Sequence, residues 1–312
     1  MDLGASPETD TPEQAGAAVA KVTQLAAVDH RPAEHRPARA VQSQYRPISS
    51  ALAIAPTVSV VIPVKNEARN LPMVLRSLPA WVNEVVLVDG RSVDDTVAVA
   101  RQCRPDIKVV TQPGTGKGDA LLAGFEACAG DIIVMIDGDG STDGGEIVRF
   151  VGALVTGADY AKGSRFASSG SSDDITMARR LGNRVLSGLV NLVFGTQYTD
   201  LCYGYNAFWS EHLPALDLDC RGFEIETLMN IRAAKAGLRV QEVPSHERPR
   251  VHGESNLRIF FDGWRILKAI TSEVFGGAQR RLRSRPESPG ARVCSAGSSK
   301  RARDGDVSKE SA

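Results

Sequence analysis

The sequence predicts an α/β fold in which a mostly parallel sheet is flanked by helices. Short apolar runs alternate with segments of helical character across residues 57–275, and this alternation is typical of βαβ units. Two of the apolar runs, Val85–Val88 and Ile132–Ile136, lead directly into an aspartate. Because ligands bind at the carboxyl edge of a parallel sheet, these carboxylates indicate a site at that edge.

The predicted elements follow one another at short spacing. Apolar runs rich in β-branched residues predict strands, and the stretches between them have the length and pattern of helices. In chain order we expect strands at 58–64, 84–89, 108–111 and 131–137, and helices at 70–78, 96–103 and 120–129.

The segments on both sides of this domain are expected to be disordered. Residues 1–56 show no sustained period, and residues 276–312 are rich in Ser, Pro and Gly. Eight Lys or Arg residues and one acid, Glu287, lie between residues 276 and 303. Such a basic tail increases solubility or attracts anionic phospholipid weakly. We therefore expect one folded domain, at residues 57–275.

The overall composition argues against nucleic-acid-binding, membrane-spanning and secreted proteins. The chain has 37 basic and 37 acidic residues, which argues against a dedicated nucleic-acid binder. No apolar run approaches the roughly 18 residues of a spanning helix, and none has the form of a secretory signal. Five cysteines without Cys-x-x-Cys spacing favour reduced thiols. We expect a cytoplasmic protein, soluble or peripheral on the cytoplasmic face of the membrane.

Asp137 and Asp139 form the most informative motif. They follow the apolar run Ile132–Ile136 and are separated by Gly138, which lets the backbone turn. Two carboxylates at this spacing suit Mg²⁺ or Mn²⁺, with phosphate oxygens and water completing the coordination. An Asp- and Gly-rich turn that only ends a strand is the alternative interpretation.

A second candidate site follows the expected strand at 108–111. Gly114–Gly118 lies between a strand and a helix and contains Lys117, a setting in which backbone N–H groups can bind phosphate. The segment departs from a nucleotide P-loop, because Thr111 replaces the first glycine of that pattern. It also departs from the dinucleotide pattern, because Asp119 replaces a glycine.

Basic side chains gather in the second half of the domain. Arg165, the pair Arg179 and Arg180, and Arg250 lie in loop-like, Gly- and Ser-containing sequence. Guanidinium groups match phosphate oxygens two at a time, so these residues suit a phosphorylated acceptor or a pyrophosphate leaving group. A solvated surface position is the alternative for any one of them.

Two acids, Glu224 and Glu226, alternate in Arg221–Met229. Either could act as a general base beside an acceptor hydroxyl, or lie outward on the following helix. The pattern does not choose between them. Near the strand at 58–64, Glu67 either holds a ribose or favours the start of the next helix.

Taken together, these motifs resemble the family 2 inverting glycosyltransferases of the GT-A fold, most closely the soluble dolichyl- or polyprenyl-phosphate sugar synthases. The resemblance covers about residues 58–268. Pro63, Asn66 and Glu67 match the family's opening Pro-x-x-Asn-Glu, and Asp137-Gly138-Asp139 matches its metal-binding Asp-x-Asp. The segment Gly116–Gly118 is similar to the family's Gly-Lys-Gly.

Three further motifs carry the resemblance, two of them with a departure. Val88–Thr96 is similar to the family's Val-Asp-Asp-Gly-Ser-x-Asp-x-Thr, but Gly90 replaces the second Asp. Gly163–Arg165 matches the Gly-Ser-Arg of the lipid-phosphate branch. Arg250–Asn256 is similar to its Arg-x-x-Gly-x-Ser-Lys, with Asn256 in place of the Lys.

The resemblance and the motifs together imply a metal-dependent transferase of a UDP- or GDP-sugar, with Mg²⁺ or Mn²⁺ as cofactor and a polyprenyl phosphate acceptor. The residues expected to bind the nucleotide sugar are Pro63, Lys65, Glu67, Asp89, Lys117 and Asp137; those expected to hold the acceptor phosphate are Arg165, Arg179, Arg180, Arg250 and Ser255; Asp137 and Asp139 would bind the metal; and Asp139, Glu224 and Glu226 are the catalytic candidates.

The acceptor determines which side chains the reaction needs. A phosphate is already ionised at neutral pH and needs only positioning, whereas a hydroxyl of a small molecule or glycan needs a base, Glu224 or Glu226. A non-catalytic nucleotide-binding protein is the alternative from another class. Residues 257–270 form an amphipathic pattern that either docks on a membrane interface or packs as the last helix of the domain.

Overall fold

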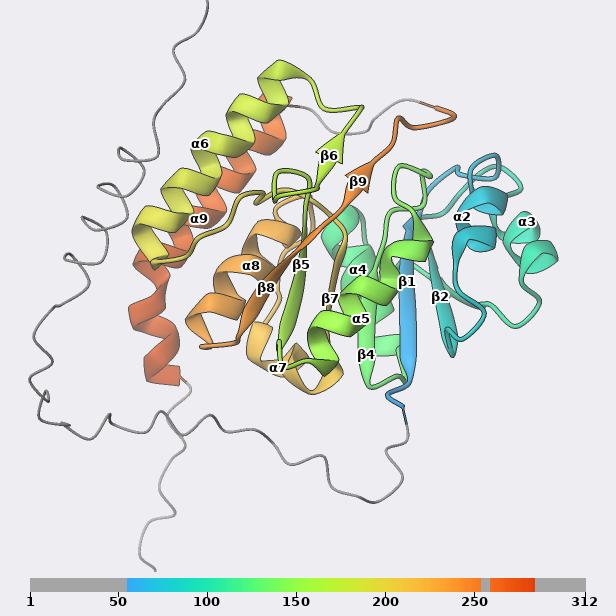
Figure 1. Cartoon of the computed structure of the whole chain (residues 1–312), viewed down its shortest axis with the longest axis horizontal. Coiled ribbons are helices and arrows are strands. Elements are labelled where there is room, and N and C mark those ends of the chain that lie inside the picture. The colour runs from blue at the N-terminus through green and yellow to red at the C-terminus, as the bar shows by residue number, and fades with distance from the viewer. Residues whose placement is uncertain (1–54, 254–258, 284–312) are drawn as a thin grey trace, which may run out of the picture. The chain divides into compact units, whose positions relative to one another are not determined.

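Figure 1 presents the computed structural model of the chain, which describes residues 55–253 and 259–283. The strands are β1 (Val58–Val64), β2 (Glu84–Asp89), β3 (Lys108–Thr111), β4 (Ile132–Met135), β5 (Tyr160–Ser164), β6 (Ser171–Ser172), β7 (Asn206–Trp209), β8 (Val240–Pro244) and β9 (His246–Glu247). The helices are α2 (Leu71–Ser77), α3 (Thr96–Cys103), α4 (Lys117–Ala127), α5 (Ile147–Val155), α6 (Met177–Phe194), α7 (Leu213–Leu216), α8 (Ile225–Lys235) and α9 (Ile259–Arg283), with 3₁₀ turns at Gly144–Glu146 and Ser210–His212.

The large sheet has the order β3-β2-β1-β4-β7-β5-β8. All neighbouring strands run parallel except β7, which is antiparallel to both β4 and β5. The register pairs Val64 with Asp89 and Val61 with Met135. The carboxyl ends of β1, β2 and β4 therefore meet at one edge of the sheet.

Side-chain alternation along β1 divides the core into two layers. Val60 and Ile62 face the layer that contains α2, α3 and α5, whereas Val61 faces the layer that contains α4 and α8. Successive residues of a strand point to opposite faces, and β1 is buried on both, so its sequence is almost continuously apolar. This explains why the unbroken runs predict the strands correctly.

A third cluster joins α6 and α9 to the body of the domain. Val190 of α6 and Ile266 and Ile270 of α9 pack with Ile231 of α8. Figure 1 shows α6 and α9 side by side beyond the β5–β8 end of the sheet. The described part of the amphipathic segment, residues 259–270, therefore belongs to the last helix of the domain, which was one of the two roles expected for it.

The predicted α/β fold and its first seven elements are confirmed, with small shifts at their ends. The strand expected at 131–137 is β4, which spans Ile132–Met135, and the helix expected from residue 120 begins at Lys117. Helix α9 continues to Arg283, past the boundary expected at residue 275. The N-terminal extension and most of the basic tail lie outside the described residues. No described helix is both long and apolar enough to cross a membrane.

The close approach of α4 to the sheet at Gly124 tests this packing. A methyl group added at Gly124 of α4 would overlap Val61 Cγ1 and lie 2.9 Å from Val88 Cγ2. Because both valines are buried and stiff, we expect Gly124→Ala to lower the free energy of unfolding by roughly 1–3 kcal/mol in urea titrations.

The control is Gly152→Ala in α5, where nothing lies within 4 Å of the added carbon. This change should stabilise the protein by up to about 1 kcal/mol, because Ala is the better helix former. Equal effects of the two substitutions would contradict the assigned packing of α4.

Candidate functional site

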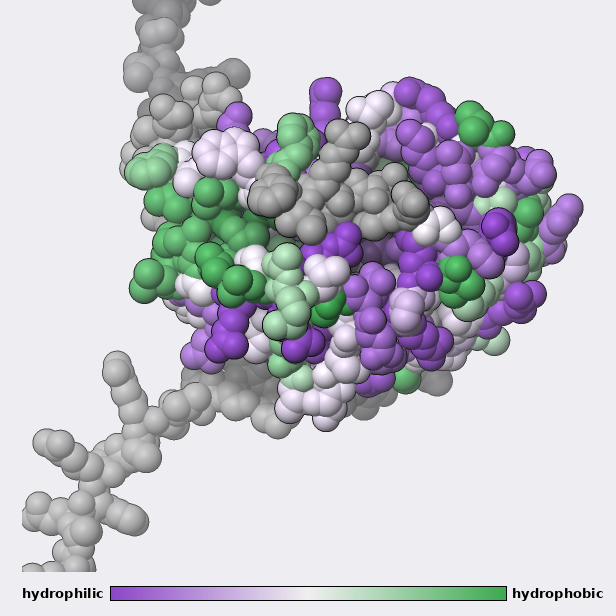
Figure 2. Space-filling model, turned by 90° about the horizontal axis from the view of Figure 1, so that it is seen from above, coloured by the Kyte–Doolittle hydropathy of each residue, from purple (hydrophilic) through white to green (hydrophobic). Residues whose placement is uncertain are grey.

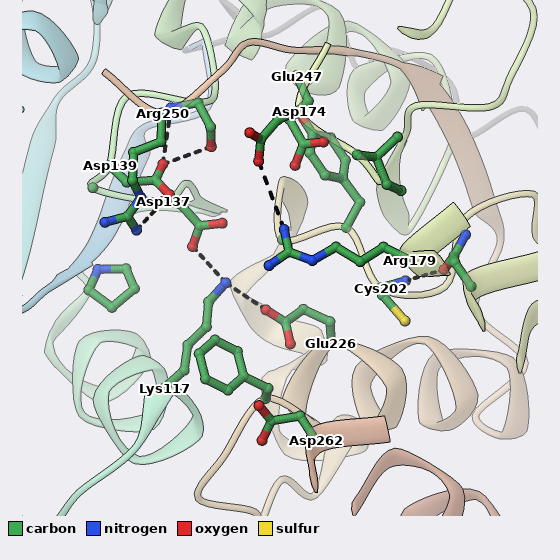
Figure 3. A pocket seen from close by; sticks show the side chains of 18 of the residues that line it. Lys117, Asp137, Asp139, Asp174, Arg179, Cys202, Glu226, Glu247, Arg250 and Asp262 are labelled. Atoms are coloured by element: carbon green, nitrogen blue, oxygen red, sulfur yellow. Dashed lines mark hydrogen bonds and ion pairs between the residues drawn. The ribbon is translucent and has the colours of Figure 1, made fainter. Parts of the chain in front are cut away.

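A pocket of about 870 Å³ opens at the carboxyl edge of β1 and β4. Residues from the ends of these strands, the start of α4, the loop before β7, α6, α8, α9 and the segment after β9 line it. Figure 3 shows its charged side chains, with Lys117 between two carboxylates and Arg250 beside Asp139. The site thus combines segments that are far apart in the sequence.

Lys117 links the first aspartate of the motif to α8. Its Nζ lies 2.6 Å from Asp137 Oδ1 and 2.7 Å from Glu226 Oε1. Burial opposes the charge of Lys117, but the two carboxylates outweigh it and hold its pKa above the usual value. Burial raises the pKa of Glu226, and Lys117 opposes this only in part. Lys117 is therefore a cation at neutral pH, placed beside Asp137.

Arg250 makes the equivalent link for the second aspartate. Its Nη2 lies 2.9 Å from Asp139 Oδ2, and its Nη1 lies 3.1 Å from Glu67 Oε1. Burial disfavours the ionised form of Asp139, but hydrogen bonds from Ser141 and the charge of Arg250 outweigh it, so the pKa of Asp139 is lowered. Burial raises the pKa of Glu67 despite hydrogen bonds from Asn70 and the charge of Arg250. Glu67 is thus a buried residue of the site, where the sequence left a helix-start role open.

The two glutamates considered as a base are placed differently. Glu226 lines the pocket, whereas Glu224 is not among the lining residues and pairs with Arg265 at 3.0 Å. Among the expected nucleotide-binding residues, Pro63 and Lys65 line the pocket. Asp89 is buried at the end of β2, away from the lining, and accepts a hydrogen bond from the Ser92 N–H.

Some of the backbone N–H groups that Gly114–Gly118 was expected to offer to a phosphate already have partners within the chain, and that of Gly114 donates to Asp119 Oδ2. The N–H groups of Gly118 and Asp119 donate to the Arg221 carbonyl, at 3.0 and 3.3 Å. Gly116 has a φ of 95° and packs so closely on Arg221 that a side chain would overlap the same carbonyl. The glycines serve to bring the loop against Arg221 and to place Lys117 at the first turn of α4.

Gly204 is a site residue that the sequence pattern did not reveal. A carbon added there would lie 2.8 Å from both Asp137 Oδ2 and Lys117 Nζ. The sequence feature that could have indicated this role is the position of the glycine between two tyrosines, Tyr203 and Tyr205, which are both buried. The antiparallel direction of β7 brings this loop to the carboxyl edge of β4.

Arg165 lines the pocket, but its nitrogens already bind acids of this chain. Nε and Nη2 donate to Asp200 at 2.7 and 3.0 Å, and Nη1 donates to Glu247. Burial disfavours the charge of Asp200, yet Arg165 outweighs it and lowers the pKa of Asp200. The geometry therefore gives Arg165 a structural role between β5, the loop before β7 and β9.

The neighbouring arginines of α6 point in different directions. Arg179 lines the pocket and its Nη1 lies 3.9 Å from Asp174 Oδ2. Arg180 is exposed, lies over the Phe166 ring and is not among the lining residues. Ser255, expected to contact the acceptor, lies outside the described residues, as does Asn256.

The donor set at Asp137 and Asp139 suits a hard divalent cation. Within residues 55–253 and the described side chains of α9, no group of three or more His, Cys, Asp or Glu side chains could form a closed metal site. Mg²⁺ and similar ions are commonly bound by one or two carboxylates, with phosphates and water in the other positions. These two aspartates fit that arrangement.

Comparison with known proteins decides the family. The sequence profile of glycosyl transferase family 2 matches residues 59–224, slightly more than half of the chain. The chain is a family 2 glycosyltransferase. The resemblance noted in the motifs is confirmed, and the protein is an enzyme rather than a non-catalytic nucleotide-binding protein.

Curated relatives support the same assignment. The glycosyltransferase is 31% identical over 210 residues to glycosyltransferase AglJ of Haloferax volcanii, which covers 66% of this chain and 68% of AglJ. It is 30% identical over 236 residues to the polyprenol monophosphomannose synthase of Mycolicibacterium smegmatis, which covers 72% of this chain and 88% of the synthase.

A solved structure confirms the GT-A fold. Glucosyl-3-phosphoglycerate synthase of Mycobacterium tuberculosis, in complex with Mn²⁺, UDP and phosphoglyceric acid, superposes with a TM-score of 0.58. The match covers 70% of the glycosyltransferase and 79% of the synthase, at 21% identity. At that identity the likeness concerns the fold alone.

The buried pair of Arg165 and Asp200 predicts a pH-dependent contribution to stability. We expect Asp200→Asn to lower the free energy of unfolding by roughly 3 kcal/mol at neutral pH, because it leaves a buried guanidinium partly uncompensated. Since the folded-state pKa of Asp200 lies below its ordinary value of 3.8, the contribution is present above that pH and is lost as pH falls through the folded-state pKa.

Urea titrations from pH 7 down to pH 3 measure this difference between wild type and variant. Asp106→Asn is the control, since Asp106 pairs with Arg104 at the surface and should contribute less than about 1 kcal/mol. The assignment of a stabilising Arg165–Asp200 ion pair would be contradicted if the loss of unfolding free energy in Asp200→Asn stayed constant or grew as the pH fell.

Proposed function

We propose that the glycosyltransferase moves a sugar from a UDP- or GDP-sugar to a polyprenyl or dolichyl phosphate, with Mg²⁺ or Mn²⁺, at the cytoplasmic face of the membrane. The observation that carries the choice of acceptor is the state of the two glutamates: Glu226 is tied to Lys117 and Glu224 to Arg265. Neither is a free base for a hydroxyl. A phosphate acceptor is already ionised and needs no base.

The basic residues of the pocket suit a reaction between two phosphorylated compounds. Lys117, a cation at neutral pH, can offset charge on the departing nucleoside diphosphate. Arg179 faces the pocket from α6 and suits the acceptor phosphate. A metal bound by Asp137 and Asp139 would supply further stabilisation of the leaving group. The acceptor oxygen then attacks the anomeric carbon from the face opposite the leaving group, which inverts the configuration.

Two features of known proteins support this assignment. The relative from Mycolicibacterium smegmatis is named as a polyprenol monophosphomannose synthase, and the structural neighbour was solved with Mn²⁺ and UDP. Pro63, Lys65 and Glu67, which line the pocket after β1, are the residues expected to contact the nucleotide.

Transfer to a hydroxyl is the second candidate. The observation in its favour is that burial raises the pKa of Glu226, which would make its carboxylate a stronger base once Lys117 is drawn away. The acceptor tests below separate this candidate from the first.

The metal assignment predicts that Asp137→Asn and Asp139→Asn weaken binding of Mn²⁺ in the presence of UDP or GDP by at least tenfold, and sugar transfer by roughly 100-fold or more. Calorimetric titration measures the first quantity, and release of nucleoside diphosphate from sugar nucleotides measures the second.

Asp143→Asn is the matched control for these changes. Asp143 lies in the same loop but pairs with Arg248 at the surface and does not line the pocket, so metal binding should be unchanged. Wild-type metal binding in both Asp137→Asn and Asp139→Asn would refute the assignment of the metal site.

The acceptor assignment predicts that Arg179→Gln raises the KM for a short-chain prenyl phosphate by about tenfold or more, because a charge-assisted contact to phosphate is lost. Arg180→Gln, its exposed neighbour, should change this KM by less than twofold, roughly the effect of a surface charge. Steady-state rates with varied acceptor concentration provide the measurement.

Glu226→Gln and Glu224→Gln decide between the two acceptors. With a prenyl phosphate as acceptor, the transfer rate of each variant should stay within roughly tenfold of the wild-type rate. Loss of a general base would instead lower the rate by about 10²–10⁴-fold. Product formed only on hydroxyl acceptors, together with a loss of that size in Glu226→Gln, would favour the second candidate.

A further inference from the structure

Helices α6 and α9 expose an unusual number of large apolar side chains. Leu192 of α6 and Phe275 of α9 are 84% and 80% exposed. The exposed apolar residues on these two helices are Met177, Leu181, Val185, Leu192 and Val193 on α6 and Phe261, Trp264, Val274 and Phe275 on α9. Figure 2 shows hydrophobic side chains gathered over this end of the molecule. We call this surface the α6–α9 face.

The exposed residues follow helical spacing. Met177, Leu181 and Val185 are four residues apart, and Phe261, Trp264 and Phe275 recur at intervals of three and eleven, so each set lies along one side of its helix. The two helices pack against each other through residues on other sides, such as Val190 and Ile266. Two neighbouring apolar stripes therefore form one surface. Contiguous apolar patches of this kind mark interaction sites.

The charge of the α6–α9 face has one sign. Arg180 and Arg184 of α6 are exposed, whereas Arg179 faces the pocket, and α6 contains no acidic residue. The two acids of α9, Asp262 and Glu273, are both buried. Lys268 is exposed on α9. Apolar side chains surrounded by cations, without exposed acids on the described turns, are complementary to an anionic lipid interface.

The same two helices form a wall of the pocket. Arg179 and Asn183 of α6 and Asp262 and Ile266 of α9 line it, while other residues of the same helices carry the apolar stripes. A substrate held in the bilayer beneath the α6–α9 face would thus lie next to the pocket. A membrane surface next to the pocket would bring a substrate to the site only if that substrate has a lipid chain.

We propose that the α6–α9 face docks on the surface of an anionic phospholipid bilayer, from which the pocket takes its lipid-linked phosphate. The inference rests on the proposed function, because it names the surface through which that acceptor reaches the site. A second copy of the chain is the less suitable occupant, since self-association would place cations opposite cations.

Vesicle sedimentation of the full chain tests the docking surface. Wild type should sediment with vesicles of phosphatidylcholine and phosphatidylglycerol, and this binding should weaken as salt is added. The double variant Leu181→Asn, Phe275→Ser should bind at least roughly tenfold more weakly, because two exposed apolar side chains no longer enter the interface. The basic tail is present in both proteins, so the difference reports on the face alone.

The matched control is Val93→Asn with Val155→Asn, which removes two exposed apolar side chains from other parts of the surface. This control should bind vesicles as wild type does. Absence of wild-type binding, or equal binding by Leu181→Asn, Phe275→Ser, would overturn the proposal. A concentration-dependent dimer in sedimentation velocity, lost in the same variant, would also overturn it by assigning the face to a second copy.

Transfer assays separate this inference from the proposed function. Leu181→Asn, Phe275→Ser should use a water-soluble short-chain prenyl phosphate at the wild-type rate, but a long-chain acceptor embedded in vesicles at least roughly tenfold more slowly. If no prenyl phosphate is used by wild type, the proposed acceptor is wrong, while vesicle sedimentation still decides whether the face binds lipid.

Discussion

The contact of Lys117 with Asp137 and Glu226 holds the site together, because it joins three elements that belong to different parts of the sequence. Lys117 begins α4, Asp137 follows β4 and Glu226 lies in the first turn of α8. A buried ammonium needs nearby carboxylates, and two carboxylates at this distance need a cation between them. The approach of Gly204 and the contact of the Gly116 loop with Arg221 both accommodate this arrangement. Arg250 likewise forms ion pairs with two carboxylates, those of Asp139 and Glu67.

Most of the sheet and half of the site follow from short-range patterns in the sequence. Strands buried on both faces require unbroken apolar runs, so Val58–Val64 and Ile132–Ile136 are readily recognised. Parallel pairing then brings Glu67, Asp89 and Asp137 to one edge, because the strands before them all end there. The helices between these strands are equally predictable, and their ends shift by only a few residues.

The remaining features depend on contacts that spacing does not encode. Arg165 binds Asp200 and Glu247, which lie 35 and 82 residues further along the chain. The spacing of these residues does not predict their contact, which depends on how β5, the antiparallel β7 and β9 are arranged. Glu224 and Glu226 have the same chemistry two residues apart, and only the packing of α8 decides which faces the pocket. The amides of Gly118 and Asp119 would suit a phosphate if the Arg221 carbonyl were not there.

The direction of β7 has a consequence for how this enzyme could diversify. Because β5 and β7 are antiparallel neighbours, with Lys162 opposite Asn206, the chain leaves the sheet after Ser164 and returns to it at nearly the same place. Residues 165–205, which include α6, therefore form a connection whose two ends lie next to each other in the sheet. Such a segment can change in length or character without altering the strand order of the half that holds Glu67 and Asp137. The fold thereby separates the strands that hold Glu67 and Asp137 from a segment, residues 165–205, whose length the sheet does not constrain.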